Sequence, residues 1–422
     1  MLENNIRYTT VNTTTNNPPL ISGKGCMVMD INGKKYIDGC SQTLNLVLGQ
    51  CNKAINKAVI EQLNKITFTS SRFSNKPAND LAEKLIKITP KDLNRVNLKM
   101  TSGSLANEGA IKAARKFTGK NIIISVNNSH HGQTIGTMEI SGKHWNIPYI
   151  KNRKAVFLST PVSEDIENNL NKELEKIIKE YGDDLAGFII EPIMVDAGVV
   201  VPSQKYHLKI RHFCDTYNIP LIYDEIQTAF GWLGNIFASD FYGVVPDIMT
   251  LGKGLGAGFP LSAMLLNEKY DVLNYGEHEI TYGAHPVSCV ASMALIDILE
   301  NTNILSEVKE KGIYIKEQLL SLAKDNNFIK NITGEGLIIG IELDNSNDSN
   351  IVDNIISKML DLGVILRKSK VGANSHVIQF KPPIIISYSE INEILNKLEY
   401  ALKYFIKFNN KKDNFHKTIK VS

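Results

Sequence analysis

The stretch DIMTLGKGLGAGFPLSAML, residues 247–265, places a lysine among glycines between two apolar runs. Three functions explain a lysine in such a place: a phosphate-binding loop, the glycine-rich turn of a dinucleotide-binding fold, or covalent chemistry. A phosphate-binding loop of the GxxxxGK type needs Ser or Thr directly after the lysine, because that hydroxyl binds the metal ion of the nucleotide. Gly254 follows Lys253 here, so this explanation fails.

The glycines fit the spacing of a dinucleotide-binding turn better, since Gly252, Gly254 and Ala257 match G-x-G-x-x-G/A. That turn opens a helix, however, whereas Phe259-Pro260 leads here into SAMLL, a second strand-like run. The match is therefore weak. The remaining interpretation is a lysine at the carboxyl end of a strand, ringed by glycines that let a large group approach the backbone.

Five apolar runs along the middle of the chain predict strands buried on both faces, as in a largely parallel sheet. They cover residues 121–126, 186–193, 220–226, 247–251 and 262–266. Amphipathic segments such as residues 204–217 separate them. We therefore expect an α/β fold whose ligands bind at the carboxyl ends of the strands.

The two ends of the chain differ from this middle part. Residues 27–37 are typical of a small hairpin that turns at Asn32-Gly33, and helices alternate with short strands after about residue 300. We expect a second, small α+β domain built from both ends, residues 1–55 and 301–422, beside a large domain of residues 56–300.

Composition limits the possible classes of protein. The 422 residues are 43% hydrophobic and 22% charged, with a formal net charge of +3, so neither nucleic acid nor a membrane is indicated as a partner. No apolar run resembles a secretory signal or spans a bilayer, which predicts a cytoplasmic protein. Five scattered cysteines without a CxxC pair indicate neither disulfides nor a metal site.

Two further motifs lie where such a sheet brings segment ends together. Asp224 follows the buried run PLIY, and a carboxylate there acts either as a structural cap or as the partner of a cation such as a protonated ring nitrogen. Ser102, Gly103 and Ser104 precede a helix, and its free amides suit an anion, although an ordinary Ser cap has the same pattern. An anion cradle, a carboxylate and a lysine together match the phosphate, ring nitrogen and aldehyde of pyridoxal phosphate.

With these motifs the chain resembles the class III aminotransferases of fold type I, the family of ornithine, acetylornithine, 4-aminobutyrate and omega-amino acid aminotransferases. The resemblance extends from MDINGKKYIDG, near residue 27, to PPIIIS, which ends at Ser387. It implies a mostly parallel central sheet, pyridoxal 5'-phosphate as the cofactor, and a homodimer with its sites at the interface.

The resemblance also implies roles for residues in the matching motifs. Lys253 is expected to form the Schiff base and to act as the catalytic base. Asp224, in IYDEIQTAFG, is expected to pair with the pyridinium nitrogen, with Gln227 near the phenolic oxygen.

The phosphate is expected to bind at Gly103 and Ser104, with Thr281 of ITYGAHPVSC reaching the phosphate held in the partner subunit. His130, in SHHGQT, stands where the family has an aromatic residue that stacks on the ring. Imidazole stacks as well but also titrates, so stacking alone and a part in proton transfer are both open. In FGWLG, Trp232 stands where the family usually has arginine.

The substrate clamp departs most from the family. In IQFKPPI, Gln379 replaces an arginine that binds the substrate carboxylate, and Glu191, in IIEPIM, matches the acidic partner of that arginine. Lys381 is expected on the same strand face as Gln379 and is a candidate replacement. Arg72 and Arg367, in loop-like segments, are the other candidates.

The expected function is transfer of an amino group from an amine or omega-amino compound to a 2-oxo acid through a Schiff base on Lys253. A related aminomutase or amino acid epimerase, a cofactor-binding relative without activity, and a dehydrogenase are the alternatives. Gln227 weighs against an aminomutase, because the resembling aminomutases tend to carry Met there. The intact Lys253, Asp224 and Gly103-Ser104 set weighs against an inactive relative. The sequence does not identify the amino donor or the 2-oxo acid.

Overall fold

The computed structural model describes residues 17–143, 150, 153–324, 326, 328–344, 349–369 and 376–419, with the side chains of 406–419 excepted. Its centre is a seven-stranded sheet of order β4-β10-β9-β8-β7-β5-β6. β10 is antiparallel to β9 and β4, and the other pairs are parallel. The strands are β4 (Arg95–Met100), β5 (Ile122–Val126), β6 (Ala155–Leu158), β7 (Leu185–Ile190), β8 (Leu221–Asp224), β9 (Ile248–Leu251) and β10 (Ser262–Leu266).

All five predicted strands are therefore present in a mostly parallel sheet, with small shifts of their ends. β4 and β6 were not predicted. β4 carries Arg95 and Lys99 and is buried only at alternate positions near its end, while β6 has four residues and only Leu158 is fully buried. Neither is a solid apolar run.

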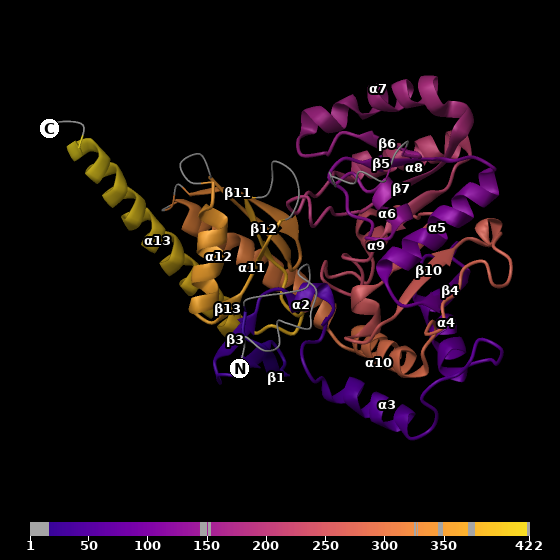
Figure 1. Cartoon of the computed structure of the whole chain (residues 1–422), viewed down its shortest axis with the longest axis horizontal. Helices are drawn as coiled ribbons and strands as arrows, with labels where there is room; N and C mark the ends of the chain where they lie inside the picture. The colour runs from indigo at the N-terminus through magenta and orange to yellow at the C-terminus, as the bar shows by residue number, and fades with distance from the viewer. Residues whose placement is uncertain are drawn as a thin grey trace.

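Helices pack along this sheet (Figure 1), with α5 against β7, β9 and β10 and α8 against β8. The sequence predicts α8 correctly, because its buried residues recur at helical spacing. The helices of this part are α3 (Lys53–Leu63), α4 (Lys76–Ile88), α5 (Gly103–Thr118), α6 (Ile135–Ile140), α7 (Glu164–Tyr181), α8 (Gln204–Tyr217), α9 (Ala238–Tyr242) and α10 (Pro286–Asn301), with the single turns η3 (Gly182–Asp184), η4 (Lys253–Gly256) and η5 (Glu268–Tyr270).

Both ends of the chain build the smaller α+β part, as predicted. One sheet, β1-β2-β3-β13, joins the N-terminal hairpin to a strand from the far end of the chain, because β13 pairs in parallel with β3. A second sheet has the order β11-β12-β15-β14. The strands are β1 (Leu20–Lys24), β2 (Met27–Asp30), β3 (Lys35–Asp38), β11 (Ile329–Glu335), β12 (Ile338–Leu343), β13 (Val364–Ile365), β14 (Arg367–Lys368) and β15 (Val377–Phe380).

Three helices complete this part: α11 (Ile304–Lys324), α12 (Ile351–Asp361) and α13 (Tyr388–Ile419). The far end of α13, yellow in Figure 1, extends away from the body. Within the described residues, no helix has the length and apolar character needed to cross a bilayer. All five cysteines are free thiols, and only Cys51 is exposed.

A left-handed turn follows β3 and bears the label α2 (Ser41–Leu44). Its four residues have φ values of 49°, 47°, 75° and 65°. Non-glycine residues in this region cost roughly 1–2 kcal/mol each, so the turn needs strong support. The Asp38 carboxylate accepts hydrogen bonds from the amides of Cys40 and Gln42, both at 3.0 Å. The Ser41 hydroxyl donates to the carbonyl of Lys381 at 2.8 Å.

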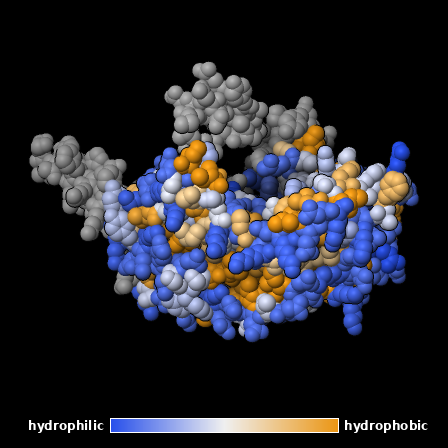
Figure 2. Space-filling view, turned by 90° about the horizontal axis from the view of Figure 1, so that it is seen from below, coloured by the Kyte–Doolittle hydropathy of each residue, from blue (hydrophilic) through white to orange (hydrophobic). Residues whose placement is uncertain are grey.

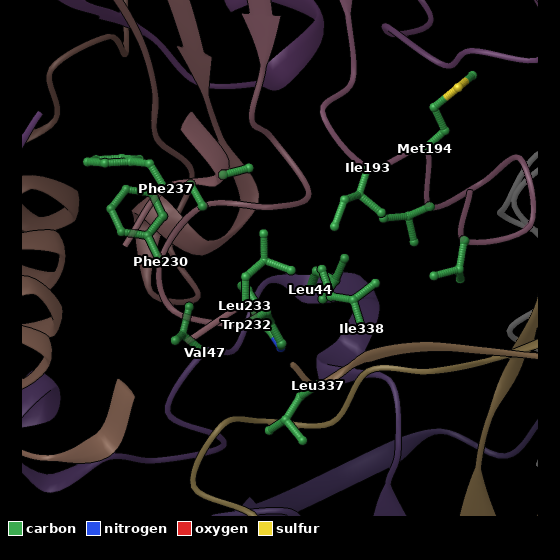
Figure 3. Packing of buried hydrophobic residues seen from close by; sticks show 14 of the residues in the cluster. Leu44, Val47, Ile193, Met194, Phe230, Trp232, Leu233, Phe237, Leu337 and Ile338 are labelled. Atoms are coloured by element: carbon green, nitrogen blue, oxygen red, sulfur yellow. The ribbon is translucent and has the colours of Figure 1, made fainter. Parts of the chain in front are cut away.

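The core continues from this turn into both parts of the chain. Figure 3 shows Leu44, Leu233 and Ile338 close together, from α2, the segment after β8, and β12. Trp232 is buried in the same cluster, and its indole Nε1 donates to the carbonyl of Pro382 at 2.9 Å. Its ring also packs closely against Gly254, since a Cβ there would lie 3.1 Å from the ring and 3.0 Å from Val47. Trp232 therefore connects the Lys253 loop to the segment that follows β15.

Candidate active site

A pocket of about 280 Å³ lies at the carboxyl ends of the parallel strands. Lys253, which follows β9, lines it with residues that follow β4 and β5. The lining residues are Asn45, Thr101, Ser102, Gly103, Ser104, His130, His131, Gly132, Ile226, Lys253, Phe259, Pro260 and Leu261. The sheet thus places the ligand site where parallel α/β proteins have it.

Lys253 is held in an unusual backbone conformation, with a φ of 39°. Its loop continues into β10 and not into a long helix, which agrees with the rejection of the dinucleotide-binding turn. Burial lowers the pKa of the Lys253 amine, while the carboxylates of Asp196, Asp224 and Glu191 oppose that shift. A lowered pKa favours the neutral amine, which is the form that attacks a carbonyl and accepts a proton.

Asp224 ends β8 beside Thr250 of β9. Its Oδ2 lies 2.8 Å from Nδ1 of His131 and accepts a second hydrogen bond of 2.8 Å from the Asn107 amide. Asn107 is itself fixed, because its Oδ1 accepts a bond of 2.6 Å from the Thr250 hydroxyl. This buried network fixes Asp224 one hydrogen bond away from the pocket lining. The sequence analysis missed both His131 and Asn107.

The two acids of the DEI motif have different roles. Glu225 accepts from the amides of Ala238 and Ser239, both at 2.8 Å, and so holds the start of α9. Burial raises the pKa of Glu225 to about 7. Glu225 therefore has the contacts of a structural cap. Asp224 bonds to His131 and Asn107 beside the pocket, and its Oδ1 also accepts from the backbone amide of Ile226 at 3.2 Å.

The start of α5 forms an anion cradle. Ser102 is its N-cap and accepts from the amide of Leu105 at 3.4 Å, and the first amides of a helix have no partner within it. The Ser104 hydroxyl accepts from the amide of Gln133 at 3.1 Å. A Cβ at Gly103 would come within 2.6 Å of Ile226, and one at Gly132 within 2.5 Å of Ser104. Both glycines are required by close packing around the cradle.

His130 and Glu191 lie together on the next strand ends. The backbone amide of His130 donates to Glu191 at 2.8 Å, and Gln227 approaches the other carboxylate oxygen at 3.4 Å. Burial lowers the pKa of His130 to about 4, so its ring is neutral near pH 7. Burial, with the charge of Asp224, raises the pKa of Glu191 well above its usual value. A neutral imidazole favours stacking for His130.

The side-chain amide of Gln379 points to the backbone of Val195 and donates a hydrogen bond of 2.8 Å to its carbonyl. Lys381 is buried at 2% exposure. Burial lowers its pKa to about 8, with Asp196 opposing and Arg367 and Lys253 reinforcing the shift. Lys381 is therefore close enough to Lys253 for their charges to interact. A cation that replaces the family's arginine as the substrate clamp must lie this near to the lysine. Asp196, a carboxylate that the sequence analysis missed, acts on both lysines.

Of the predicted residues, four line this pocket: Gly103, Ser104, His130 and Lys253. The others lie outside its lining: Asp224, Gln227, Glu191, Arg367, Gln379, Lys381, Arg72 and Thr281. Arg72 is exposed on the loop between α3 and α4. Thr281 is exposed on a loop that β4 holds through the amide of Ile280 and the carbonyl of Lys99, at 3.0 Å. Arg367, by contrast, lies opposite Gln379 in the β14–β15 pair.

These groups fit pyridoxal 5'-phosphate. The cradle of α5, with glycines where a Cβ finds no space, suits the phosphate. The buried Asp224 carboxylate suits a protonated ring nitrogen, and the buried Lys253 amine suits the aldehyde.

Comparison with known proteins agrees with this geometry. Residues 10–402 match the family model described as aminotransferase class-III. Acetylornithine aminotransferase from Methanocaldococcus jannaschii is 34% identical over 90% of this chain and 92% of its own length. Among solved structures, an omega-aminotransferase from Paracoccus denitrificans has a TM-score of 0.87 and 25% identity, covering 95% of this chain and 98% of its own.

The ornithine aminotransferase from Toxoplasma gondii, described with partial occupancy of the cofactor at its active site, has a TM-score of 0.85 and 26% identity, covering 95% and 93% of the two chains. The fold is that of the fold type I transaminases. The chain belongs to the class III aminotransferases, and it is a pyridoxal-phosphate-dependent transaminase.

Proposed function

We propose that this aminotransferase takes its amino group from an amine or an omega-amino compound without a carboxylate anchor, and passes it to a 2-oxo acid. The observation that supports this most strongly is the pair of residues at the end of β15. The amide of Gln379 is turned to Val195, and the cations nearby are Lys381 and Arg367, which lies opposite Gln379 in the β14–β15 pair.

We propose that Lys253 is both the attachment point of the cofactor and the base that moves the proton. Bound pyridoxal phosphate withdraws electrons from the carbon that carries the amino group and so makes its proton acidic. The Lys253 amine, whose pKa is lowered by burial, would take that proton and deliver it two bonds away, to the carbon of the cofactor's aldehyde group. Asp224, oriented by His131 and Asn107, holds the ring nitrogen in its protonated form.

The acceptor needs a cation for its carboxylate. Lys381 and Arg367 lie within electrostatic range of Lys253, whereas Arg72 is exposed. A buried ammonium that forms a charge-assisted hydrogen bond contributes about 1.5–3 kcal/mol. We assign the acceptor carboxylate to Lys381 first and to Arg367 second, and Arg72 stays a candidate only for a site shared between subunits.

We also propose a homodimer in which Thr281 reaches the phosphate of the partner subunit. Thr281 is exposed, and so is an apolar group on α3 and the loop after it: Ile60, Leu63, Ile66, Phe68 and Phe73. Phe73 alone is 74% exposed. Figure 2 shows hydrophobic residues gathered on the face seen from below, and exposed apolar patches of this kind mark interfaces. The free cysteines fit a reducing compartment, and we propose the cytoplasm.

A coupled assay tests the proposed reaction. Incubation of the enzyme with an amine and a 2-oxo acid should yield the amino acid of that oxo acid in step with loss of the amine. An aminomutase or epimerase, which the comparisons do not favour, would change its amino substrate without any oxo acid. Turnover of an amino substrate that continues after the oxo acid is omitted would overturn the proposal.

A further inference from the structure

The left-handed turn α2 ends beside the pocket, and Asn45 is the residue that it delivers there. The Asn45 amide nitrogen donates to the carbonyl of Gln42 and to the hydroxyl of Thr43, both at 2.8 Å. A backbone carbonyl only accepts hydrogen bonds, so the nitrogen, and not the oxygen, must face the turn. Both amide hydrogens are therefore used within the turn.

The remaining polar atom of this side chain is the carbonyl oxygen Oδ1. No hydrogen bond to Asn45 Oδ1 occurs among the described residues of the chain. Asn45 is partly exposed and lines the pocket, so this oxygen is accessible to a ligand. An acceptor whose orientation is fixed in advance costs little entropy to use.

Five neighbouring lining residues have no assigned part in holding the cofactor, and they are mostly apolar: Ile226, Phe259, Pro260 and Leu261, with Thr101 as the polar exception. In such a wall a single acceptor discriminates between ligands, since a polar group left unpaired on binding is penalised. Asn45 can select only for a hydrogen-bond donor, because its own N–H groups are occupied.

We infer that Asn45 is a specificity-determining residue that selects amino donors carrying a second N–H or O–H group at the end of an apolar chain. This inference rests on the proposed amine donor and narrows it to diamines, amino alcohols and related compounds. The turn itself acts as the positioning element, since Thr43 and Gln42 fix the direction of the Asn45 oxygen. Asp38 and Ser41 hold the turn in place.

The test compares matched donors in single half-reactions of the cofactor-loaded enzyme. Linear alkylamines of three to six carbons are paired with the amino alcohols of the same length, and kcat/KM is measured from the change in cofactor absorbance. The wild-type enzyme should prefer the amino alcohol by roughly five- to tenfold at its best chain length. Asn45→Ala should bring that ratio to about one while both donors still react.

Thr43→Val removes one of the two anchors of the Asn45 amide and should lower the ratio partway. Asn64→Ala is the matched control, because its amide also donates to a backbone carbonyl, that of Ile60 at 3.0 Å, but at the end of α3 and outside the pocket lining. The preference should be unchanged in Asn64→Ala. A purely structural role of Asn45 would lower the rates of both donors equally and preserve the ratio, which would overturn the inference.

The possible failures are distinguishable. Reaction of both donor types without a difference at any chain length overturns the role of Asn45 and leaves the amine donor intact. Failure of every amine and amino alcohol, with reaction of 4-aminobutyrate or ornithine, overturns the proposed donor class and this inference together.

Discussion

The two walls of the pocket are built from different parts of the chain. One, the cofactor wall, consists of Lys253 and the start of α5, with Asp224 one hydrogen bond away from the lining. The other, the substrate wall, consists of Asn45 at the end of the turn α2, and the segment 379–381 from the far end of the chain supports that turn through the bond from Ser41 to the carbonyl of Lys381. The cofactor wall has the residues that its family leads one to expect, whereas the substrate wall departs from them.

The cofactor wall determines the type of reaction, whereas the substrate wall determines which molecule reacts. Parallel strands with fully buried residues position Asp224 and Lys253, so the residues of the reaction are held by the buried core of the central sheet. The substrate wall depends on contacts between distant segments, such as Ser41 with Lys381. Changes there alter which molecule reacts and leave the type of reaction unchanged.

Lys253→Ala should have the largest effect, because it removes both the attachment point and the base. We expect turnover to fall on the order of 10⁴-fold or more, at the upper end of what a positioned base contributes, and the visible absorbance of the lysine-bound cofactor to disappear. Lys76→Ala, an exposed lysine on α4 paired with Asp80, is the control and should be unaffected. Wild-type turnover in Lys253→Ala would refute the assignment of the cofactor wall.

Asp224→Asn should leave the cofactor bound and reduce the rate by roughly 10²- to 10³-fold, because an amide does not hold the ring nitrogen protonated. The neighbouring Glu225→Gln gives the contrast. It weakens the cap of α9 and should lower the free energy of unfolding by about 1–2 kcal/mol with little change in rate. Equal effects of the two substitutions on rate would show that Asp224 is only a structural residue.

Lys381→Gln should raise the KM of the 2-oxo acid by roughly 10- to 100-fold and leave the first half-reaction with an amine nearly unchanged. In the wild-type enzyme the pKa of Lys381 is about 8, so the ammonium is lost and this KM should rise as the pH passes 8. Lys368→Gln, on the adjacent strand and paired with Asp353, serves as control. An unchanged KM in Lys381→Gln would transfer the role to Arg367.

The same lysine links stability to pH. Its folded pKa lies below its unfolded value of 10.5, so between pH 8 and 10.5 the unfolded state binds more protons and stability rises with pH. From pH 7 to pH 9 the free energy of unfolding should increase by about 1 kcal/mol from this group. That increment should be absent in Lys381→Gln, and its persistence there would mean that another group causes it.

Trp232→Phe should have the smallest effect on rate, within about fivefold, because Trp232 connects the walls without lining the pocket. Loss of the indole donor leaves the Pro382 carbonyl unpaired and should lower the free energy of unfolding by about 1–3 kcal/mol. Phe237→Leu removes volume from the same cluster without removing a donor. The two variants are then compared at equal free energy of unfolding. A larger fall of kcat/KM for the 2-oxo acid in Trp232→Phe would show that Trp232 positions the segment that carries Lys381.

The sequence predicts the cofactor wall because each of its groups lies at the end of a solid apolar run or of a periodic helix. It does not predict the partners of Asp224, since His131 and Asn107 are 93 and 117 residues away along the chain. Only contact in space identifies them. The domain boundaries stay a prediction, although the pairing of β3 with β13 joins the two chain ends.

The sequence does not predict the left-handed turn α2 either, for a different reason. Left-handed backbone is normally signalled by glycine, and Ser41–Leu44 contains none. Its conformation comes from the side chains of Asp38 and Ser41 and from the carbonyl of Lys381, which lies 340 residues further along the chain. The local sequence therefore does not indicate a left-handed backbone, and contacts with distant residues impose it.

The central claim is that the cofactor wall is intact while the substrate wall lacks the carboxylate-binding arginine. The most direct test is the first half-reaction of the wild-type enzyme with butylamine and with 4-aminobutyrate, which differ only by the distal carboxylate. We predict that kcat/KM for butylamine exceeds that for 4-aminobutyrate by about tenfold, because a carboxylate that leaves water without gaining a cation as its partner is penalised. A kcat/KM for 4-aminobutyrate above that for butylamine would contradict the account, because a cation would then hold the donor carboxylate despite Gln379.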